Sequence, residues 1–328
     1  MSHIPVLIQE MLTALAPAAG ETYCDATFGG GGYTAAILAS ADCRVIGIDR
    51  DPDAIARGQA LVAAHEGRLS LRHGAFGDLE ELVPESLDGV VMDIGVSSFQ
   101  IDEPHRGFSF QADGPLDMRM SLEGASAADA VNGLTEAALV DLLRDYGEED
   151  MARPIARAIV QERAAAPLVS TAALAALIER AVGGRRGART HPATKTFQAL
   201  RILVNDELGE LARALTAAER RLKPGGRLVV VSFHSLEDRM AKQFLAARAG
   251  LLGAGSRHMP EAPAGPAPSF SVTVRKPVTP CDAECDANPR ARSASLRQAV
   301  RTEAAPFAAF EPPPLSPRVA AEWREISR

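Results

Sequence analysis

The stretch that decides the fold reads Asp25-Ala-Thr-Phe-Gly-Gly-Gly-Gly-Tyr33. It connects a β-type run at residues 23–28 to a helical run at residues 34–39. Glycines between a strand and a helix let the backbone approach a ligand closely, and in a parallel sheet this turn lies where ligands bind. The stretch therefore predicts an α/β fold with a ligand site at the turn.

The neighbouring sequence repeats this alternation of strand and helix. β-type runs follow at residues 44–49, 69–73 and 89–95, and a helical run lies at residues 52–64. Val90, Val91 and Met92 are consecutive apolar residues, which is typical of a strand that is covered on both faces. A doubly wound, mostly parallel sheet with crossover helices is the predicted architecture.

A helical insertion interrupts this pattern. A polar loop at about residues 104–120 precedes helical runs at 136–146, 151–163 and 171–182, with Thr135 and Ser170 as N-caps. One long helical run, 193–222, then leads to the apolar run 228–233, which returns to the sheet, and residues 270–276 are strand-like. We predict a core of residues 1–105 and 201–328, and an RNA-recognising loop and helical insertion at 106–200.

Composition limits the class of protein. The chain has 328 residues, 46% of them hydrophobic, and no apolar run approaches the length of a membrane span. No signal peptide is visible, so we expect a cytoplasmic protein without a membrane partner. The four cysteines do not form a zinc-binding pattern, and we expect no metal.

The net charge of −7 means that an RNA partner requires local basic patches. Two such patches exist, and either is equally compatible with a solvated basic surface. The basic residues that we assign to RNA binding are Arg185, Arg186, Arg189 and Lys195 in the first patch, and Arg290, Arg292 and Arg297 in the second.

Acidic residues at the predicted strand ends indicate the type of cofactor. Asp49 follows Gly29 by 20 positions and can accept hydrogen bonds from both ribose hydroxyls of an adenosine. The dinucleotide pattern would place a third glycine at Thr34, where it is missing. Asp25, Asp49 and Asp93 favour a positively charged methyl donor, although the turn alone leaves a nicotinamide dinucleotide open.

Several longer strings of residues carry a resemblance to a known family. They are His3-Ile-Pro-Val-Leu7, Asp93-Ile-Gly-Val-Ser-Ser-Phe-Gln100, Arg106-Gly-Phe-Ser-Phe110, Leu116-Asp-Met-Arg-Met120, His191-Pro-Ala-Thr-Lys-Thr-Phe-Gln-Ala-Leu-Arg201, Val204-Asn-Asp-Glu-Leu208 and Ser232-Phe-His-Ser-Leu-Glu-Asp-Arg239. Together they closely resemble the bacterial ribosomal RNA small-subunit methyltransferase H family, the MraW-type cytosine-N4 methyltransferases. The resemblance extends from residue 3 to about residue 301.

This resemblance implies a class I, Rossmann-like methyltransferase that uses S-adenosylmethionine. The implied substrate is the exocyclic N4 of a cytidine near the decoding centre of 16S ribosomal RNA, within the small subunit. The implied cofactor contacts are Gly31, Gly32, Tyr33, Asp49, Phe76, Asp93 and Gln100. The sequence departs from the family at Tyr33-Thr34, where His-Ser is usual, and at Ser295, where Lys is usual.

Cytosine N4 is a weak nucleophile, so positioning and hydrogen-bond acceptors near its protons should dominate catalysis. The usual Asp/Asn-Pro-Pro-aromatic motif of amino methyltransferases is absent, and Asp93-Ile-Gly-Val-Ser-Ser98 occupies its place. Our candidate catalytic residues are Asp117, Asn205 and His234. Each residue also has a structural alternative. Asp117 could form only an ion pair with Arg119, Asn205 could cap a helix, and His234 could be a buried histidine with a structural role.

Two other functions remain as alternatives. A nicotinamide-dependent oxidoreductase would use the same glycines and Asp49, but the third glycine and a Tyr-x-x-x-Lys pair are missing. The second alternative is a non-catalytic RNA-binding assembly protein. Such a protein would not need a glycine-rich turn that can bind a cofactor, so the turn and Asp49 argue against it. The sequence does not determine the oligomeric state, and a homodimer remains open.

Overall fold

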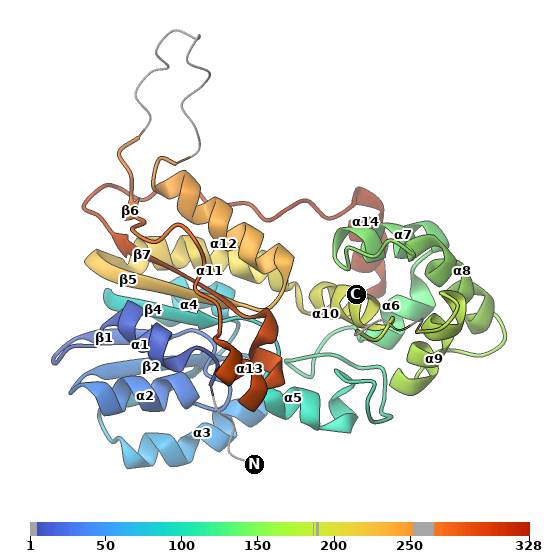
Figure 1. Cartoon of the computed structure of the whole chain (residues 1–328), viewed down its shortest axis with the longest axis horizontal. Coiled ribbons are helices and arrows are strands. Elements are labelled where there is room, and N and C mark those ends of the chain that lie inside the picture. Colours follow the sequence, from blue (N-terminus) through green and yellow to red (C-terminus); the bar gives the residue numbers. More distant parts are fainter. Residues whose placement is uncertain (1–4, 186, 188–189, 252–265) are drawn as a thin grey trace, which may run out of the picture. The chain divides into compact units, whose positions relative to one another are not determined.

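The contacts within the chain define two units. The computed structural model describes residues 5–185, 187, 190–251 and 266–328, and Figure 1 shows its helices and strands. The first unit comprises Met1–Gly95 and Leu208–Pro312, and the second comprises Val96–Glu207 and Pro313–Arg328. The boundaries predicted from the sequence lie after residues 105 and 200, with the whole C-terminal segment in the core. In the structure, the last residues belong to the second unit instead.

A mixed sheet forms the centre of the first unit. Within the described residues it has seven strands, in the order β3-β2-β1-β4-β5-β7-β6. Their bounds are β1 Thr22–Asp25, β2 Arg44–Asp49, β3 Leu69–His73, β4 Leu87–Asp93, β5 Leu222–Ser232, β6 Phe270–Ser271 and β7 Ser295–Arg301. The first five strands are parallel, and β7 runs antiparallel to β5 and β6. The predicted doubly wound α/β class is confirmed.

Helices cover both faces of this sheet. Figure 1 shows α1, α2 and α3 on one side and α4, α11 and α12 on the other. The helical segments of the first unit are α1 Ile8–Leu15, α2 Gly32–Ser40, α3 Pro52–Ala64, η1 Phe76–Asp78, α4 Leu79–Leu82, α11 Glu207–Arg221 (whose first residue falls in the second unit), α12 Ser235–Arg248, α13 Asp282–Ala287 and η3 Pro289–Ser293. Val90, Val91 and Met92 of β4 are fully buried, as their uninterrupted apolar pattern predicts.

The glycine-rich turn is anchored by Phe28, which is 3% exposed. Its ring packs against two glycines, Gly47 of β2 and Gly58 of α3. A Cβ on Gly58 would lie 2.6 Å from Phe28 Cε1 and 2.5 Å from Leu71 Cδ1. These glycines therefore let α3 and the ring lie close to the sheet, and this contact fixes the turn.

We expect Gly58→Ala to lower the free energy of unfolding by about 1–3 kcal/mol, because the added methyl group overpacks a filled site. Urea denaturation measures this change. Ala60→Leu adds more volume at an exposed position of the same helix and should change stability little. An unchanged midpoint for Gly58→Ala would show that Phe28 is not held by this contact.

The second unit is helical. Its helices within the described residues are α5 Ser98–Asp102, η2 Pro104–Arg106, α6 Ala127–Gly133, α7 Glu136–Asp145, α8 Ala152–Arg163, α9 Thr171–Ala181, α10 Thr194–Asn205 and α14 Pro317–Ile326. Both predicted N-caps are confirmed: the hydroxyls of Thr135 and Ser170 accept hydrogen bonds from Ala138 N and Ala173 N at 3.2 and 3.1 Å. No helix in the described ranges has both the length and the apolar character needed to cross a membrane.

The long helix predicted at residues 193–222 is in fact two helices. α10 ends at Asn205, and Asp206 adopts a left-handed conformation with φ 49° before α11 begins. The guanidinium of Arg201 donates to both carboxylate oxygens of Glu207, at 2.7 and 2.8 Å, across this corner. Helical periodicity continues on both sides of the corner, so the sequence pattern does not reveal it.

The end of the chain differs most from the prediction. β6 is only two residues long, whereas residues 270–276 were expected to form a strand, and β7 was not predicted. α14 completes the helical unit: the backbone N–H and the hydroxyl of Thr135 both donate to the carboxylate of Glu322 at 2.8 Å. The tail therefore contributes to the fold of both units.

Candidate functional site

Three carboxylates lie at one edge of the sheet in the first unit. Asp25, Asp49 and Asp93 are the last residues of β1, β2 and β4, and β1 pairs with both of the other strands. The glycine-rich turn starts at the same edge, directly after β1. The carboxyl ends of parallel strands are where open α/β sheets bind ligands, so this edge is the candidate site.

Asp49 shapes the turn as well as facing the site. Its Oδ2 accepts a hydrogen bond from Gly29 N at 2.7 Å, and its Oδ1 accepts one from Asp51 N at 2.8 Å. The N-cap of α3 is Asp51, whose carboxylate accepts from Asp53 N at 3.0 Å, so Asp49 is not the cap of this helix. Burial raises the pKa of Asp49, and the two backbone hydrogen bonds oppose this effect.

Burial also raises the pKa of the other two acids. It raises the pKa of Asp25 to about 6, against a hydrogen bond of 2.7 Å from the Thr34 hydroxyl. Burial, followed by repulsion from Asp25 and Glu237, raises the pKa of Asp93 to about 8. Among the described residues, Oδ1 of Asp93 is shielded from solvent and has no hydrogen-bond partner. A buried acceptor of this kind fits a donor or cation from a ligand.

The first residues of α2 also fit a ligand. Gly31 is the N-cap of this helix, with φ 75°, and a Cβ there would lie 2.9 Å from Phe28 Cζ. The first amides of an α-helix have no acceptor within the helix, so they can bind polar groups of a ligand. The amide of Gly31 donates to Phe28 O at 2.7 Å, so the amides of Gly32 and Tyr33 are the ones available to a ligand. The unsatisfied oxygen of Asp93 is suited to a cationic group.

The side chains of Tyr33 and Thr34, where the chain departs from the family, have structural roles. Tyr33 is 4% exposed, and its hydroxyl donates to Val6 O at 2.5 Å. Thr34 is fully buried and donates to Asp25. The Tyr33 hydroxyl is bonded to Val6 and the Thr34 hydroxyl to Asp25, so a ligand contact at Tyr33 would be made by its backbone.

The remaining cofactor candidates lie in different places. Phe76 begins η1, just after β3, and is half-buried, while the next backbone amide, of Gly77, donates to Glu210 at 2.8 Å. Gln100 belongs to the second unit and forms a capping box with Ser97 at the start of α5, with hydrogen bonds of 3.1 and 3.2 Å. Phe76 is thus placed at the carboxyl end of β3, whereas the Gln100 side chain caps a helix.

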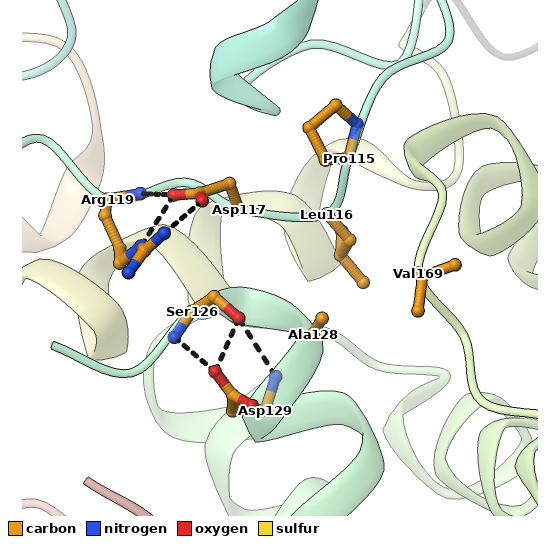
Figure 2. Close-up of a pocket in the computed structure, with 8 residues that line it drawn as sticks. All are labelled: Pro115, Leu116, Asp117, Arg119, Ser126, Ala128, Asp129 and Val169. Atoms are coloured by element: carbon orange, nitrogen blue, oxygen red, sulfur yellow. Dashed lines mark hydrogen bonds and ion pairs between the residues drawn. The ribbon is translucent and has the colours of Figure 1, made fainter. Parts of the chain in front are cut away.

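The catalytic candidate Asp117 lines a pocket of about 210 Å³ in the second unit (Figure 2). Its carboxylate accepts from Arg119 Nε at 2.9 Å and from Nη2 at 2.6 Å. Burial raises the pKa of Asp117, but the hydrogen bonds from Arg119 outweigh it and hold the pKa below its usual value. Asp117 is therefore an ionised hydrogen-bond acceptor and a weak base.

Asn205 holds the loop that carries Asp117. Its Oδ1 accepts from Met120 N at 2.9 Å, and its Nδ2 donates to Met118 O at 2.8 Å and to Arg201 O at 2.9 Å. The side chain is 2% exposed. This arrangement supports the structural alternative for Asn205, as a residue that positions the loop.

We expect Asn205→Ala to lower the free energy of unfolding by about 1–3 kcal/mol, because it leaves buried backbone groups of the loop unsatisfied. Asn205→Asp keeps the acceptor for Met120 N and should be intermediate. Thermal unfolding and amide exchange at Met120 measure the two variants. Unchanged exchange at Met120 in Asn205→Ala would contradict the positioning role.

His234 lies at the N-cap of α12 in the first unit, after β5. Its Nε2 is 3.0 Å from Oε1 of the fully buried Glu237, without the alignment of a hydrogen bond. Oε2 of Glu237 accepts from the backbone of Phe233 at 2.9 Å. Among the described residues, Nδ1 of His234 has no hydrogen-bond partner, so His234 remains a candidate acceptor near the sheet edge.

The basic residues divide into exposed and structural groups. Arg185 is exposed and pairs with Glu179 at 3.4 Å, and the exposed Lys195 donates to Glu148 O at 2.6 Å. Arg290 and Arg292 of η3 are exposed. Arg186 and Arg189 lie outside the described residues.

Arg297 is a correction to the RNA-binding set. It is 8% exposed, and its Nε and Nη2 donate to the two oxygens of Asp238 at 2.7 and 2.8 Å. Ser295, which replaces the usual Lys, donates to the same carboxylate at 2.9 Å. Arg297 therefore ties β7 to α12, and its guanidinium is not available for a phosphate.

Comparison with known sequences decides the family. The sequence pattern described as "MraW methylase family" matches residues 1–302. The chain belongs to the MraW methylase family. Family membership confirms the resemblance found in the motifs and favours a methylase over a dehydrogenase or a non-catalytic protein.

Several curated relatives carry the name Ribosomal RNA small subunit methyltransferase H. The protein of Hyphomonas neptunium is 61% identical over 92% of this chain and 89% of its own, and that of Maricaulis maris is 55% identical over 92% of both. A solved rRNA methylase from Streptococcus thermophilus is 12% identical over 92% of this chain and all of its own, with a TM-score of 0.40. The assignment to this family rests on the sequence matches.

Proposed function

We propose that the chain transfers a methyl group from S-adenosylmethionine to the exocyclic N4 of a cytidine near the decoding centre of 16S ribosomal RNA. The family match over residues 1–302 carries this proposal, because it includes every residue of the sheet-edge site. The names of the relatives support a substrate in small-subunit ribosomal RNA. The cytosine N4 comes from the motif resemblance.

The residues at the sheet edge have distinct roles in this proposal. When bound, S-adenosylmethionine supplies an electrophilic methyl group on a cationic sulfur. Asp49 accepts hydrogen bonds from the ribose hydroxyls, and the backbone of Gly31, Gly32 and Tyr33 approaches the amino-acid part. Asp93 faces a positively charged group, and Phe76 packs on the adenine.

Transfer forms a bond between N4 and the methyl carbon, breaks the bond between the methyl carbon and sulfur, and releases one proton from N4. An acceptor near the amino group orients the nitrogen lone pair and takes up the proton. We assign this role to Asp117 or His234, and we assign Asn205 to holding the loop of Asp117. Arg185, Lys195, Arg290 and Arg292 bind phosphates, which fixes the position of the RNA without reading its sequence.

The test is transfer of labelled methyl to small ribosomal subunits that lack the modification, with naked 16S RNA in parallel. We expect N4-methylated cytidine in the nucleoside digest, and inhibition by S-adenosylhomocysteine. If the protein bound the methyl donor but transferred no methyl group to either RNA, the cofactor assignment would stand and the proposed RNA substrate would be wrong. Light scattering of the same preparation decides whether a homodimer forms. We expect the protein to act in the cytoplasm, where ribosomes are assembled.

A further inference from the structure

Residues 5–7, which we call the N-terminal strap, are fixed to two distant parts of the first unit. Leu7 N donates to Oε1 of Glu284 at 2.7 Å, and Val6 O accepts from the Tyr33 hydroxyl at 2.5 Å. The ring of Pro5 lies against Gly32, because a Cβ on Gly32 would be 2.3 Å from Pro5 Cγ. The strap is thus held from α13 on one side and from α2 on the other.

The backbone of the strap is strained. Leu7 has φ 52° and ψ 35°, a left-handed conformation that costs a non-glycine residue roughly 1–2 kcal/mol. Such a conformation persists only where surrounding contacts determine it, and it is enriched at ligand sites. Leu7 is completely buried, and its N–H is paired with a carboxylate, which is a strong hydrogen bond. The hydrogen bond from Leu7 N to Glu284 therefore offsets part of the free-energy cost of the left-handed conformation.

The strap covers the residues that we assign to the methyl donor. Gly32 and Tyr33 are the first residues of α2, immediately after the glycine-rich turn. Burial raises the pKa of Tyr33, and the charges of Asp93, Asp25 and Glu284 add to this effect. The hydroxyl of Tyr33 is thus close enough to the acids of the sheet edge and to Glu284 for their charges to act on it, while it donates to Val6 O of the strap.

We propose that the N-terminal strap is one wall of the methyl-donor site, and that Glu284 and Tyr33 are positioning residues that hold it there. This inference rests on the proposed function. With the strap in place, Pro5 shields the start of α2 from water, and hydrogen bonds to a bound ligand are stronger in a site that excludes water. Released, the strap would leave the turn intact but open to solvent.

Glu284→Ala in the full chain tests the role of the carboxylate. We expect S-adenosylhomocysteine, measured by calorimetry, to bind about tenfold more weakly, in line with the loss of one charge-assisted hydrogen bond. The KM for S-adenosylmethionine should rise by a similar factor, while kcat at saturating donor and the KM for RNA stay unchanged. Hydrogen exchange at the Leu7 amide should accelerate. Tyr33→Phe, which removes only the hydroxyl, should shift the same parameters in the same direction.

Two variants serve as controls. Glu284→Gln keeps an oxygen that accepts from Leu7 N, and it should restore binding to near the wild-type value. Asp286→Ala removes an exposed carboxylate from the same helix and should change neither binding nor exchange. These controls separate the hydrogen bond to Leu7 from a general effect of charge on α13.

The outcomes distinguish this inference from the proposed function. Faster exchange at Leu7 with unchanged affinity would show that the strap moves without affecting the donor site, and would overturn the inference. Unchanged exchange would show that Glu284 does not hold the strap, which also overturns it. A wild-type chain that binds neither S-adenosylhomocysteine nor S-adenosylmethionine would refute the proposed function itself.

Discussion

Replacing Asp49 with alanine should weaken the binding of S-adenosylmethionine by at least about 100-fold, because two hydrogen bonds to a carboxylate are worth about 1.5–3 kcal/mol each. Each carboxylate oxygen of Asp49 already accepts one backbone N–H, from Gly29 or from Asp51. A carboxylate oxygen has a second lone pair, so both ribose hydroxyls can still be bound. Calorimetry with S-adenosylmethionine and with S-adenosylhomocysteine measures the loss.

The design must separate ligand binding from the shape of the turn, because Asp49 supports both. Asp49→Asn keeps one acceptor oxygen for the backbone and removes the charge, so its affinity should fall between those of wild type and Asp49→Ala. Asp42→Ala is the matched control, since Asp42 lies before the start of β2, at the opposite end from Asp49, with its side chain 87% exposed. A folded Asp49→Ala protein with wild-type affinity would remove Asp49 from the site.

The core of the fold could be predicted because local patterns determine it. The apolar run at Val90–Met92 and the glycines after β1 carry their structural meaning within a few residues. The same holds for the N-caps Thr135 and Ser170, which each bond to an amide three residues away. The acids Asp25, Asp49 and Asp93 could likewise be assigned to one edge, since they end parallel strands.

The C-terminal strand could not be predicted, because its support comes from distant residues. The basic run that contains Arg297 and Arg301 has the composition of an RNA-binding tail. In the structure, Arg297 pairs with Asp238, while Arg301 donates to Glu219 O at 2.8 Å and to Ser269 O at 3.0 Å. Arginine that is buried against a carboxylate or carbonyls has the same sequence signature as arginine that binds phosphate.

The roles of individual site residues also could not be predicted from the sequence. Asn205 has the residue type of a catalytic acceptor, but its hydrogen bonds to Met118 and Met120, 87 and 85 positions away, show a structural use. Tyr33 follows the glycines as a cofactor contact should, yet its hydroxyl binds Val6. Motifs place residues near a site, whereas the direction of each side chain depends on tertiary packing.

The charge of the sheet edge is lower than a count of its acids suggests. The sequence gives three carboxylates for a cationic ligand, but burial raises the pKa of Asp25 to about 6 and that of Asp93 to about 8. Without a ligand, Asp93 is therefore largely protonated at neutral pH. A cationic methyl donor would favour the ionised form, so binding should release a proton from Asp93.

This linkage predicts that the affinity for S-adenosylmethionine rises with pH, by up to about tenfold per pH unit, until it levels off near pH 8, the pKa of Asp93 without ligand. Asp93→Asn cannot ionise, so its affinity should be weaker at pH 8 and lack this rise. Calorimetry from about pH 6 to about pH 9, in buffers of different ionisation enthalpy, measures both the affinity and the released proton. The donor's own α-amino group titrates near pH 8 with either protein, so the difference between the two curves isolates Asp93.

Stability without ligand should show the opposite trend. Because the pKa of Asp93 is higher in the folded chain than in the unfolded chain, its contribution to stability is complete below about pH 4 and is lost as the pH rises through about 8. Asp93→Asn removes this loss, so its melting temperature should match wild type below about pH 4 and exceed it by a growing margin up to about pH 8. Asp25→Asn should show the same effect in a narrower window, from about pH 4 to about pH 6. If wild type and Asp93→Asn had the same pH dependence of affinity and the same pH dependence of melting temperature, Asp93 would not be the titrating group. That result would refute the idea that the cationic donor offsets the cost of burying the Asp93 carboxylate.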